Sequence, residues 1–136
     1  MKLIVCLDDR DGMLFNGRRQ SRDRLLIEDL FSLAGNKKLI ISPFSAKLFA
    51  TYPDVSVLSD PLSEAGEDDL VFIESLSLKK NLSSIDTMII YHWGECYPAD
   101  FYFDTPPDQN GFSLVETYEF AGSSHDKITR EIWKKQ

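Results

Sequence analysis

The stretch that decides the fold is residues 2–34, KLIVCLDDRDGMLFNGRRQSRDRLLIEDLFSLA. Its first part, residues 2–7, is apolar and rich in branched side chains. Because this run is too short for a helix, it predicts a buried strand. Residues 8–20 then hold two glycines, three aspartates and three arginines without periodicity. Such a composition is typical of a loop, and we expect this loop to wrap over a site.

A helix is expected to follow this loop. Ser21 is a good N-cap, and Gly35 stands where a C-terminal glycine should. Between them, apolar side chains recur at helical spacing: Leu25, Leu26, Ile27, Leu30, Phe31 and Leu33. The helix is therefore predicted to begin at Ser21 and to bury one apolar face.

Asp23 is the unusual residue of this helix. It precedes Ile27 by four residues and Leu30 by seven, so a straight helix places its carboxylate on the core-facing stripe, toward the sheet or a cleft beside it. Burial would raise the pKa of Asp23, whereas the helix dipole, Arg22 and Arg24 would lower it, and the sequence leaves the balance open. The simpler interpretation is a first-turn aspartate that only complements the dipole.

Composition indicates an ordinary globular protein of one domain, residues 1–136. Apolar residues make up 43% of the chain, and a chain of this length can bury roughly two-thirds of the surface that it exposes when unfolded. The net charge of −7 argues against nucleic acid or an anionic membrane as the main partner. Asp8 and Asp9 break the opening apolar run, so no signal peptide is expected. Cys6 and Cys96 fit reduced thiols in a cytoplasmic protein.

Five of the six arginines are concentrated between residues 10 and 24. Arginine is suited to a bidentate grip on phosphate or carboxylate. Arg18, Arg19 and Arg22 are therefore candidates for an anion site at the loop and the helix start. The alternative is a solvated surface, on which the arginines pair with the acids Asp8, Asp9, Asp11, Glu28 and Asp29.

The rest of the chain alternates apolar runs with short helical or polar segments. Strands are predicted at 38–42, 55–58, 70–73 and 87–93, and short helices at 43–50 and 76–84. Residues 59–69 are expected to form an acidic loop, either without regular structure or with one helical turn. Two strand-like runs, 113–120 and 127–133, close the chain as a hairpin. These patterns predict an α/β fold with a mostly parallel, twisted central sheet, flanking helices and a C-terminal antiparallel hairpin.

In this order of elements the chain resembles the dihydrofolate reductase family over nearly its whole length. LIVCLDDRDG at 3–12 is similar to the family's first strand and the start of its active-site loop, and Asp23 follows Gly12 at the spacing of the family's active-site acid. The further similar segments are NKKLIIS at 36–42, DDLVFIES at 68–75, TMIIYHWGECYPADFYFD at 87–104, FSLVETYEF at 112–120 and KITREIWKK at 127–135. The resemblance implies a dihydrofolate-reductase-like fold.

The resemblance also implies a chemistry, in which hydride passes from a nicotinamide to a C=N bond of a pterin-like ring. Asp23 would hold the amidine edge of the ring, and Tyr91 would lie at the back of the pocket, although a buried core tyrosine explains Tyr91 as well. NADPH would bind at four positions: Ser42, Ser45, Glu74 and Ser75.

The departures from the family fall at this cofactor site. Where the family has Gly-Arg-x-Thr, the chain reads Ser42-Pro43-Phe44-Ser45, so the phosphate-binding arginine is missing. Where the family has Gly-Gly, the chain reads Glu74-Ser75, and a carboxylate there would oppose a pyrophosphate. Arg18 stands where the family has an active-site tryptophan. These departures count against NADPH in its usual pose.

Two functions therefore stay open. The first is a divergent NAD(P)H-dependent reductase of a pterin-like or related heterocycle, with an altered cofactor site, and Asp23 favours it. The second is a non-catalytic ligand-binding or regulatory module, monomeric or homodimeric, whose arginine-rich loop holds a small anionic ligand, and Glu74 favours it. His92 and His125 lie far apart in sequence with no clustered ligand pattern, so no metal site is expected.

Overall fold

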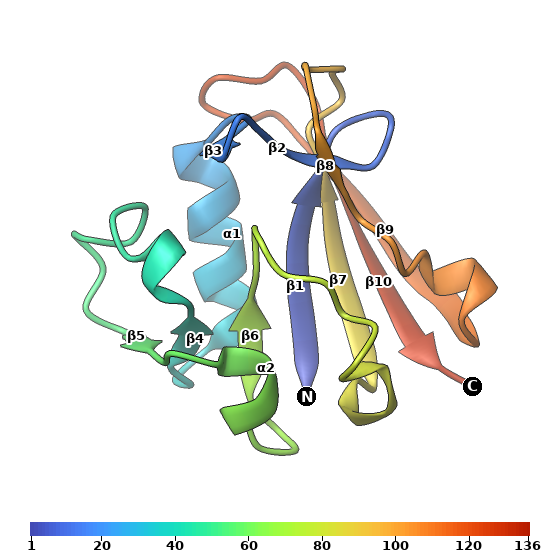
Figure 1. The fold of residues 1–136 in the computed structure, drawn as a ribbon. Helices are drawn as coiled ribbons and strands as arrows, with labels where there is room; N and C mark the ends of the chain where they lie inside the picture. Colours follow the sequence, from blue (N-terminus) through green and yellow to red (C-terminus); the bar gives the residue numbers. More distant parts are fainter.

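The computed structural model describes all residues of the chain, 1–136, and is built on one seven-stranded sheet with the strand order β5-β4-β6-β1-β7-β10-β9 (Figure 1). The strands are β1 (Lys2–Leu7), β4 (Leu39–Ile41), β5 (Val55–Val57), β6 (Leu70–Phe72), β7 (Thr87–His92), β9 (Phe112–Phe120) and β10 (Ile128–Lys135). The first five in spatial order run parallel to one another. Strand β10 is antiparallel to its neighbour β7, and β9 is antiparallel to β10. The predicted mostly parallel α/β sheet with a closing hairpin is confirmed.

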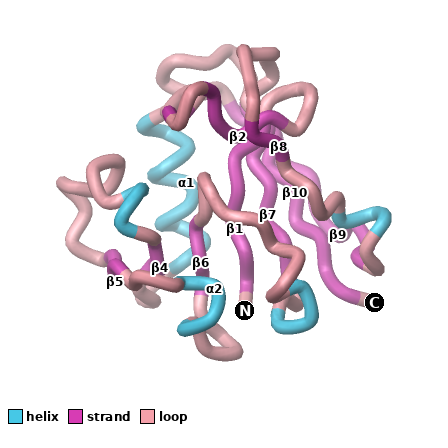
Figure 2. The backbone as a smooth tube through the Cα atoms, in the orientation of Figure 1, coloured by secondary structure: helices cyan, strands magenta, loops and turns pink.

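The central strands bury both of their faces. Along β1, Leu3 and Val5 point into one hydrophobic cluster and Ile4 points into the other, and all three side chains are fully buried. This alternation explains why the strand is a continuous apolar run. The cluster that contains Ile4 is covered by helix α1 (Arg24–Ala34), and the other by helix α2 (Pro61–Glu64) and long connections (Figures 1 and 2).

The helices are shorter than the sequence patterns predicted. Helix α1 begins at Arg24 rather than at Ser21, and its N-cap is Asp23, whose side chain accepts hydrogen bonds from the backbone N–H groups of Leu25 and Leu26. The predicted helix 43–50 is a 3-10 helix, Pro43–Ser45, followed by turns. Successive i to i+3 backbone bonds in this segment explain why it never widens into an α-helix.

The second of these predicted helices, 76–84, is also wrong for most of its length. Only Leu82–Ser84 is helical, again as a 3-10 turn, and a third 3-10 turn is Pro107–Gln109. The apolar residues of the segment, such as Leu78, instead pack individually against the sheet from an irregular connection.

The predicted loop 8–20 contains a small hairpin that the sequence patterns did not predict. Strands β2 (Gly12–Phe15) and β3 (Arg18–Arg19) pair antiparallel, and β2 also pairs with β8 (Phe101–Tyr102). Asn16 and Gly17 form the turn with φ of 53° and 70°, which matches the type I′ turn that joins paired strands. This hairpin lies across the carboxyl ends of the parallel strands (Figure 2).

None of the helices is both long and apolar enough to cross a membrane.

Candidate functional site

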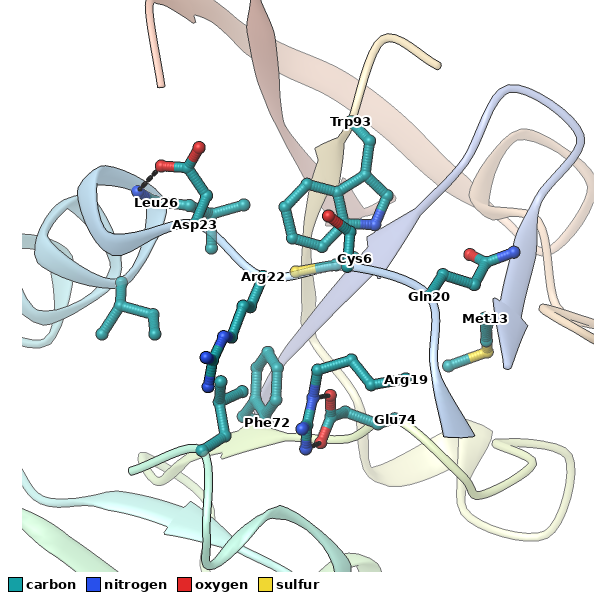
Figure 3. A pocket seen from close by; sticks show the side chains of 13 residues that line it. Cys6, Met13, Arg19, Gln20, Arg22, Asp23, Leu26, Phe72, Glu74 and Trp93 are labelled. Atoms are coloured by element: carbon teal, nitrogen blue, oxygen red, sulfur yellow. Dashed lines mark hydrogen bonds and ion pairs between the residues drawn. The ribbon is translucent and has the colours of Figure 1, made fainter. Parts of the chain in front are cut away.

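A cleft opens at the carboxyl ends of β1 and β6, between the β2–β3 hairpin and the start of α1 (Figure 3). This is the edge at which open parallel sheets commonly bind ligands. The lining is aromatic and aliphatic with a few charged groups: Cys6, Met13, Arg19, Gln20, Ser21, Arg22, Asp23, Leu26, Ile27, Leu48, Phe72, Glu74 and Trp93.

The cleft is narrow. The space between its atoms, including the open mouth, is about 430 Å³, but the centre of a water molecule can move through only about 20 Å³ of it. A ligand must therefore be thin, or the hairpin and the side chains must move apart to admit it.

A charged cluster fills one side of the cleft. The guanidinium of Arg19 makes two parallel bonds to the carboxylate of Glu74, from Nε to Oε1 and from Nη2 to Oε2, the second 2.7 Å long. The Ser45 hydroxyl donates to the same Oε2 at 2.6 Å. The hydrogen bond to Glu74 raises the pKa of Arg19, and the Glu74 side chain is only 9% exposed. Glu74 is thus neutralised inside the protein and ties the hairpin to β6.

This cluster determines how the predicted cofactor residues are arranged. Ser45 and Glu74 lie together, whereas Ser75 is half-buried and outside the cleft lining. The Ser42 hydroxyl is buried and has no hydrogen-bond partner. A free hydroxyl would suit a phosphate oxygen, but Ser45 is already bonded to a carboxylate. Pro43, at the first position of the 3-10 turn, has no N–H to donate. The residues present do not fit a dinucleotide pyrophosphate.

The three arginines of the predicted anion site have different positions. Arg19 and Arg22 line the cleft, and Arg18 is exposed on the hairpin and does not. Arg22 is also exposed and makes no ion pair, but its side chain extends along the cleft toward Phe72 (Figure 3). The alternative of surface pairing holds for Arg24, which binds Glu28 at 3.2 Å, but Asp29 pairs with Arg130 instead.

Gln20 is a cleft residue that the sequence patterns did not single out. Its Nε2 donates to Asp8 Oδ2 at 3.0 Å and to the carbonyl of Pro98 at 3.2 Å. These two acceptors fix the orientation of the amide. Its Oε1 is buried and has no partner within the protein. Gln20 therefore lines the cleft and carries a buried acceptor that the protein leaves unsatisfied.

The carboxylate of Asp23 is completely buried and saturated with hydrogen bonds. Oδ1 accepts from the backbone of Leu25 and Leu26, and from the backbone and hydroxyl of Ser123. Oδ2 accepts from the backbone of Ser124 at 2.8 Å and from His125 Nδ1 at 2.9 Å. Burial opposes ionisation, but the bonds from His125 and the backbone outweigh it and hold the pKa of Asp23 well below its usual range.

The sequence left open whether burial or the groups that favour ionisation would dominate the pKa of Asp23, and the structure shows that the pKa is lowered. The residue borders the cleft, but its carboxylate points toward the first turn of α1 and the 121–126 connection (Figure 3). The side chains of α1 that line the cleft one turn further on are Leu26 and Ile27, which are apolar. The assignment of Asp23 as a pterin-binding acid remains a prediction from the resemblance.

Tyr91 lies in the hydrophobic cluster under α1 and is not among the residues that line the cleft. Its hydroxyl donates to Asp29 at 2.7 Å, and Arg130 binds both oxygens of Asp29 at 2.9 and 2.8 Å. Burial, reinforced by Asp29, raises the pKa of the Tyr91 phenol. This is the geometry of the core tyrosine that the sequence allowed as the alternative.

Cys6 also borders the cleft. Burial, together with the negative charge of Glu74, raises the pKa of its thiol well above the usual value. Cys6 is therefore held in the neutral thiol form, which is a weak nucleophile.

The comparison with known proteins bears on the fold. No protein-family model matches the sequence, and no curated protein matches it. The solved structure of dihydrofolate reductase from Enterococcus faecalis complexed with NADP(H) and RAB-propyl superposes with a TM-score of 0.71. The match covers 99% of this chain and 95% of that chain at 12% sequence identity. The fold is dihydrofolate-reductase-like. At this identity the likeness extends to the architecture alone, because related folds host different functions.

Proposed function

We propose that this dihydrofolate-reductase-like protein is a binding module for a small, flat organic anion, which its cleft holds through Arg22. The observation that carries the proposal is the difference between the two arginines of the cleft. Arg19 is neutralised by Glu74, whereas Arg22 makes no ion pair and extends along the cleft. The cleft therefore offers one uncompensated guanidinium, which is suited to bidentate binding of a carboxylate or phosphate.

The walls of the cleft favour a flat, apolar body for this ligand. Phe72 and Trp93 provide aromatic surface, and Leu26 provides aliphatic surface, within the narrow space between the hairpin and α1. A planar ring needs the least widening of such a space, and it stacks on aromatic side chains.

Gln20 adds a second recognition element. Its Oε1 is a buried acceptor without a partner, and a buried acceptor is costly until a donor satisfies it. A ligand with an N–H group, such as an amide or an amino-substituted ring, would remove this cost if the cleft widened enough to expose the oxygen. The ligand class is therefore an aromatic or heteroaromatic carboxylate or phosphate, preferably with one N–H donor.

The second candidate function is an NAD(P)H-dependent reductase. It draws support from the fold, which is shared with an enzyme complexed with NADP(H), and from the unpartnered hydroxyl of Ser42. The pair Ser45 and Glu74 counts against a reductase, because the Ser45 hydroxyl donates to the Glu74 carboxylate. A pyrophosphate at this position would need a free donor. The carboxylate of Asp23 also has its oxygens committed to the protein. We therefore rank hydride transfer second.

The test is thermal unfolding of the purified protein with benzoate, 4-aminobenzoate, citrate or inorganic phosphate. A ligand that binds only the folded state at a hundred times its Kd stabilises it by about 2.7 kcal/mol, which raises Tm by several degrees. We expect at least one aromatic carboxylate to do so, and Arg22→Ala to abolish the shift.

Arg18→Ala is the matched control, because it removes the same charge from an exposed arginine outside the cleft. The shift should survive in this variant. Equal losses in both variants would indicate unspecific charge screening and would contradict the proposal. A Tm increase with NADPH or NADH, together with oxidation of the nucleotide by dihydrofolate, would favour the reductase instead.

A further inference from the structure

A chain of three side chains lies at the edge of the cleft and has no part in the anion site. The hydroxyl of Ser21 is 2.9 Å from Nε2 of His125, and Nδ1 of His125 is 2.9 Å from Oδ2 of Asp23. Hydroxyl, imidazole and carboxylate are thus connected in the order that activates a serine nucleophile, and such a site is recognised by geometry rather than by position in the sequence.

The imidazole is held firmly in this position. His125 is buried and stacks on Trp93, with 4.7 Å between ring centroids and 26° between ring planes. Asp23 is fixed in turn by the helix and by the backbone of Ser123 and Ser124. Because the carboxylate accepts from Nδ1, that nitrogen carries the proton, and in the neutral imidazole Nε2 is left as an acceptor.

Tyr97 shows which hydroxyl supplies the hydrogen to Nε2. Its phenol oxygen is 3.0 Å from Nε2 and donates to Glu95 Oε2 at 2.5 Å. Burial and the bond to Glu95 raise the pKa of the phenol, which keeps it protonated. Because the Tyr97 hydrogen is engaged by a carboxylate, the Ser21 hydroxyl is the one left to donate in this cluster. Its acceptors are Nε2 at 2.9 Å and the Tyr97 oxygen, and the bond to Tyr97 lowers the pKa of the phenol against the larger effects of burial and Glu95. The Tyr97 oxygen is then free to accept a bond from Nε2 once the imidazole is protonated.

Ser21 is also accessible from the cleft. It is half-buried, lines the cleft, and lies next to Arg22. The backbone N–H groups of Ser21 and Arg22 donate to no acceptor within the protein. An unpaired N–H that points at the attacked carbonyl stabilises a developing oxyanion.

We infer that Ser21 is the nucleophile of an acyl-hydrolase site for small esters, with His125 as general base and Asp23 as the residue that positions the imidazole. Ser21 Oγ attacks the ester carbonyl and its proton passes to His125 Nε2. The ester C–O bond breaks, and the departing alkoxide takes that proton. Water then attacks the acyl-serine, its proton returns through His125 to Ser21 Oγ, and the carboxylic acid leaves.

The experiment uses the full chain with p-nitrophenyl acetate and a fluorophosphonate probe. We expect release of p-nitrophenolate, and peptide mass spectrometry should locate the phosphonate on Ser21. Ser21→Ala should lower the hydrolysis rate by a factor on the order of 10³ and abolish labelling. Ser21→Cys, which keeps a nucleophile at the same place, should retain an acyl-enzyme detectable by mass.

The matched control is Ser83→Ala, an exposed serine at the amino end of the sheet. Its rate and labelling should equal those of the original protein. Labelling on another residue, or hydrolysis unchanged in Ser21→Ala, would overturn the inference. Because the ester carries no charge, a negative result here leaves the binding of anions at Arg22 untouched.

Discussion

At the scale of single residues, Asp23 shows what sequence reasoning can and cannot reach. Burial near the start of the helix follows from its spacing to Ile27 and Leu30, and the carboxylate is indeed buried. Ser21 and Asp23 are both acceptable N-caps, and nothing local decides between them. The choice is made by Ser123, Ser124 and His125, about a hundred residues further on, whose bonds to Asp23 no local pattern contains.

The depressed pKa of Asp23 predicts a specific dependence of stability on pH. Its folded pKa lies below the unfolded value of about 3.9, so the ionised carboxylate stabilises the protein fully above about pH 4. This contribution is lost as the pH falls toward the folded pKa. Asp23→Asn should therefore cost about 2 kcal/mol of unfolding free energy at pH 7, and the cost should shrink steadily below pH 4.

Urea denaturation of both proteins between pH 2 and pH 7 measures this difference. Asp126→Asn is the control, because Asp126 is an exposed aspartate of the same connection. A cost for Asp23→Asn that does not change between pH 7 and pH 2 would contradict the assignment of the ionised form.

At the scale of elements, the β2–β3 hairpin shows how a present signal is overlooked. Asn16-Gly17 is the strongest short-range hairpin signal, yet the paired runs have only four and two residues and show no alternation. Pairing with β8, which lies more than eighty residues further on, extends this small sheet. Glu74 was interpreted from the sequence only as a carboxylate that would oppose a pyrophosphate, and its pairing with Arg19 of the hairpin was not predicted.

The bond between Arg19 and Glu74 should control the mobility of this hairpin. Removing one partner of a largely buried ion pair leaves the other unpaired, so Arg19→Met and Glu74→Gln should each cost about 2 kcal/mol, less than for a fully buried pair because Arg19 is 24% exposed. The double variant should recover about 1 kcal/mol of the summed loss. Hydrogen exchange of the hairpin amides should speed up in parallel.

Arg18→Met is the control, since Arg18 is an exposed neighbour without an ion pair and its loss should change the unfolding free energy by less than about 0.5 kcal/mol. Additive effects of the Arg19 and Glu74 variants would show that the two side chains do not stabilise one another.

At the scale of the whole molecule, the sheet could be predicted because its strands carry their own signal. Each core strand is a short apolar run with both faces buried, and the polar segments between them leave few parallel arrangements. The predictions of helices at 43–50 and 76–84 were wrong for most of their length. Apolar residues such as Phe49 and Leu78 can reach the core equally well from successive turns and from a helix. Burial was predictable at these positions, but the local backbone conformation was not.

The alternation of side chains between the two hydrophobic clusters along β1 and β7 predicts that the two faces of the sheet unfold together. Neighbouring residues of β1 and β7 contribute to opposite hydrophobic clusters, so neither cluster can lose its packing without displacing strands that the other needs. The two tryptophans report on the two faces, because Trp93 belongs to the cluster under α1 and Trp133 packs against the other. Trp93→Phe and Trp133→Phe each leave a single fluorescent probe. In each variant, urea unfolding is monitored both by fluorescence and by far-ultraviolet circular dichroism, and the two midpoints should coincide. Separate midpoints within one variant would show that the 136 residues do not fold as one cooperative domain.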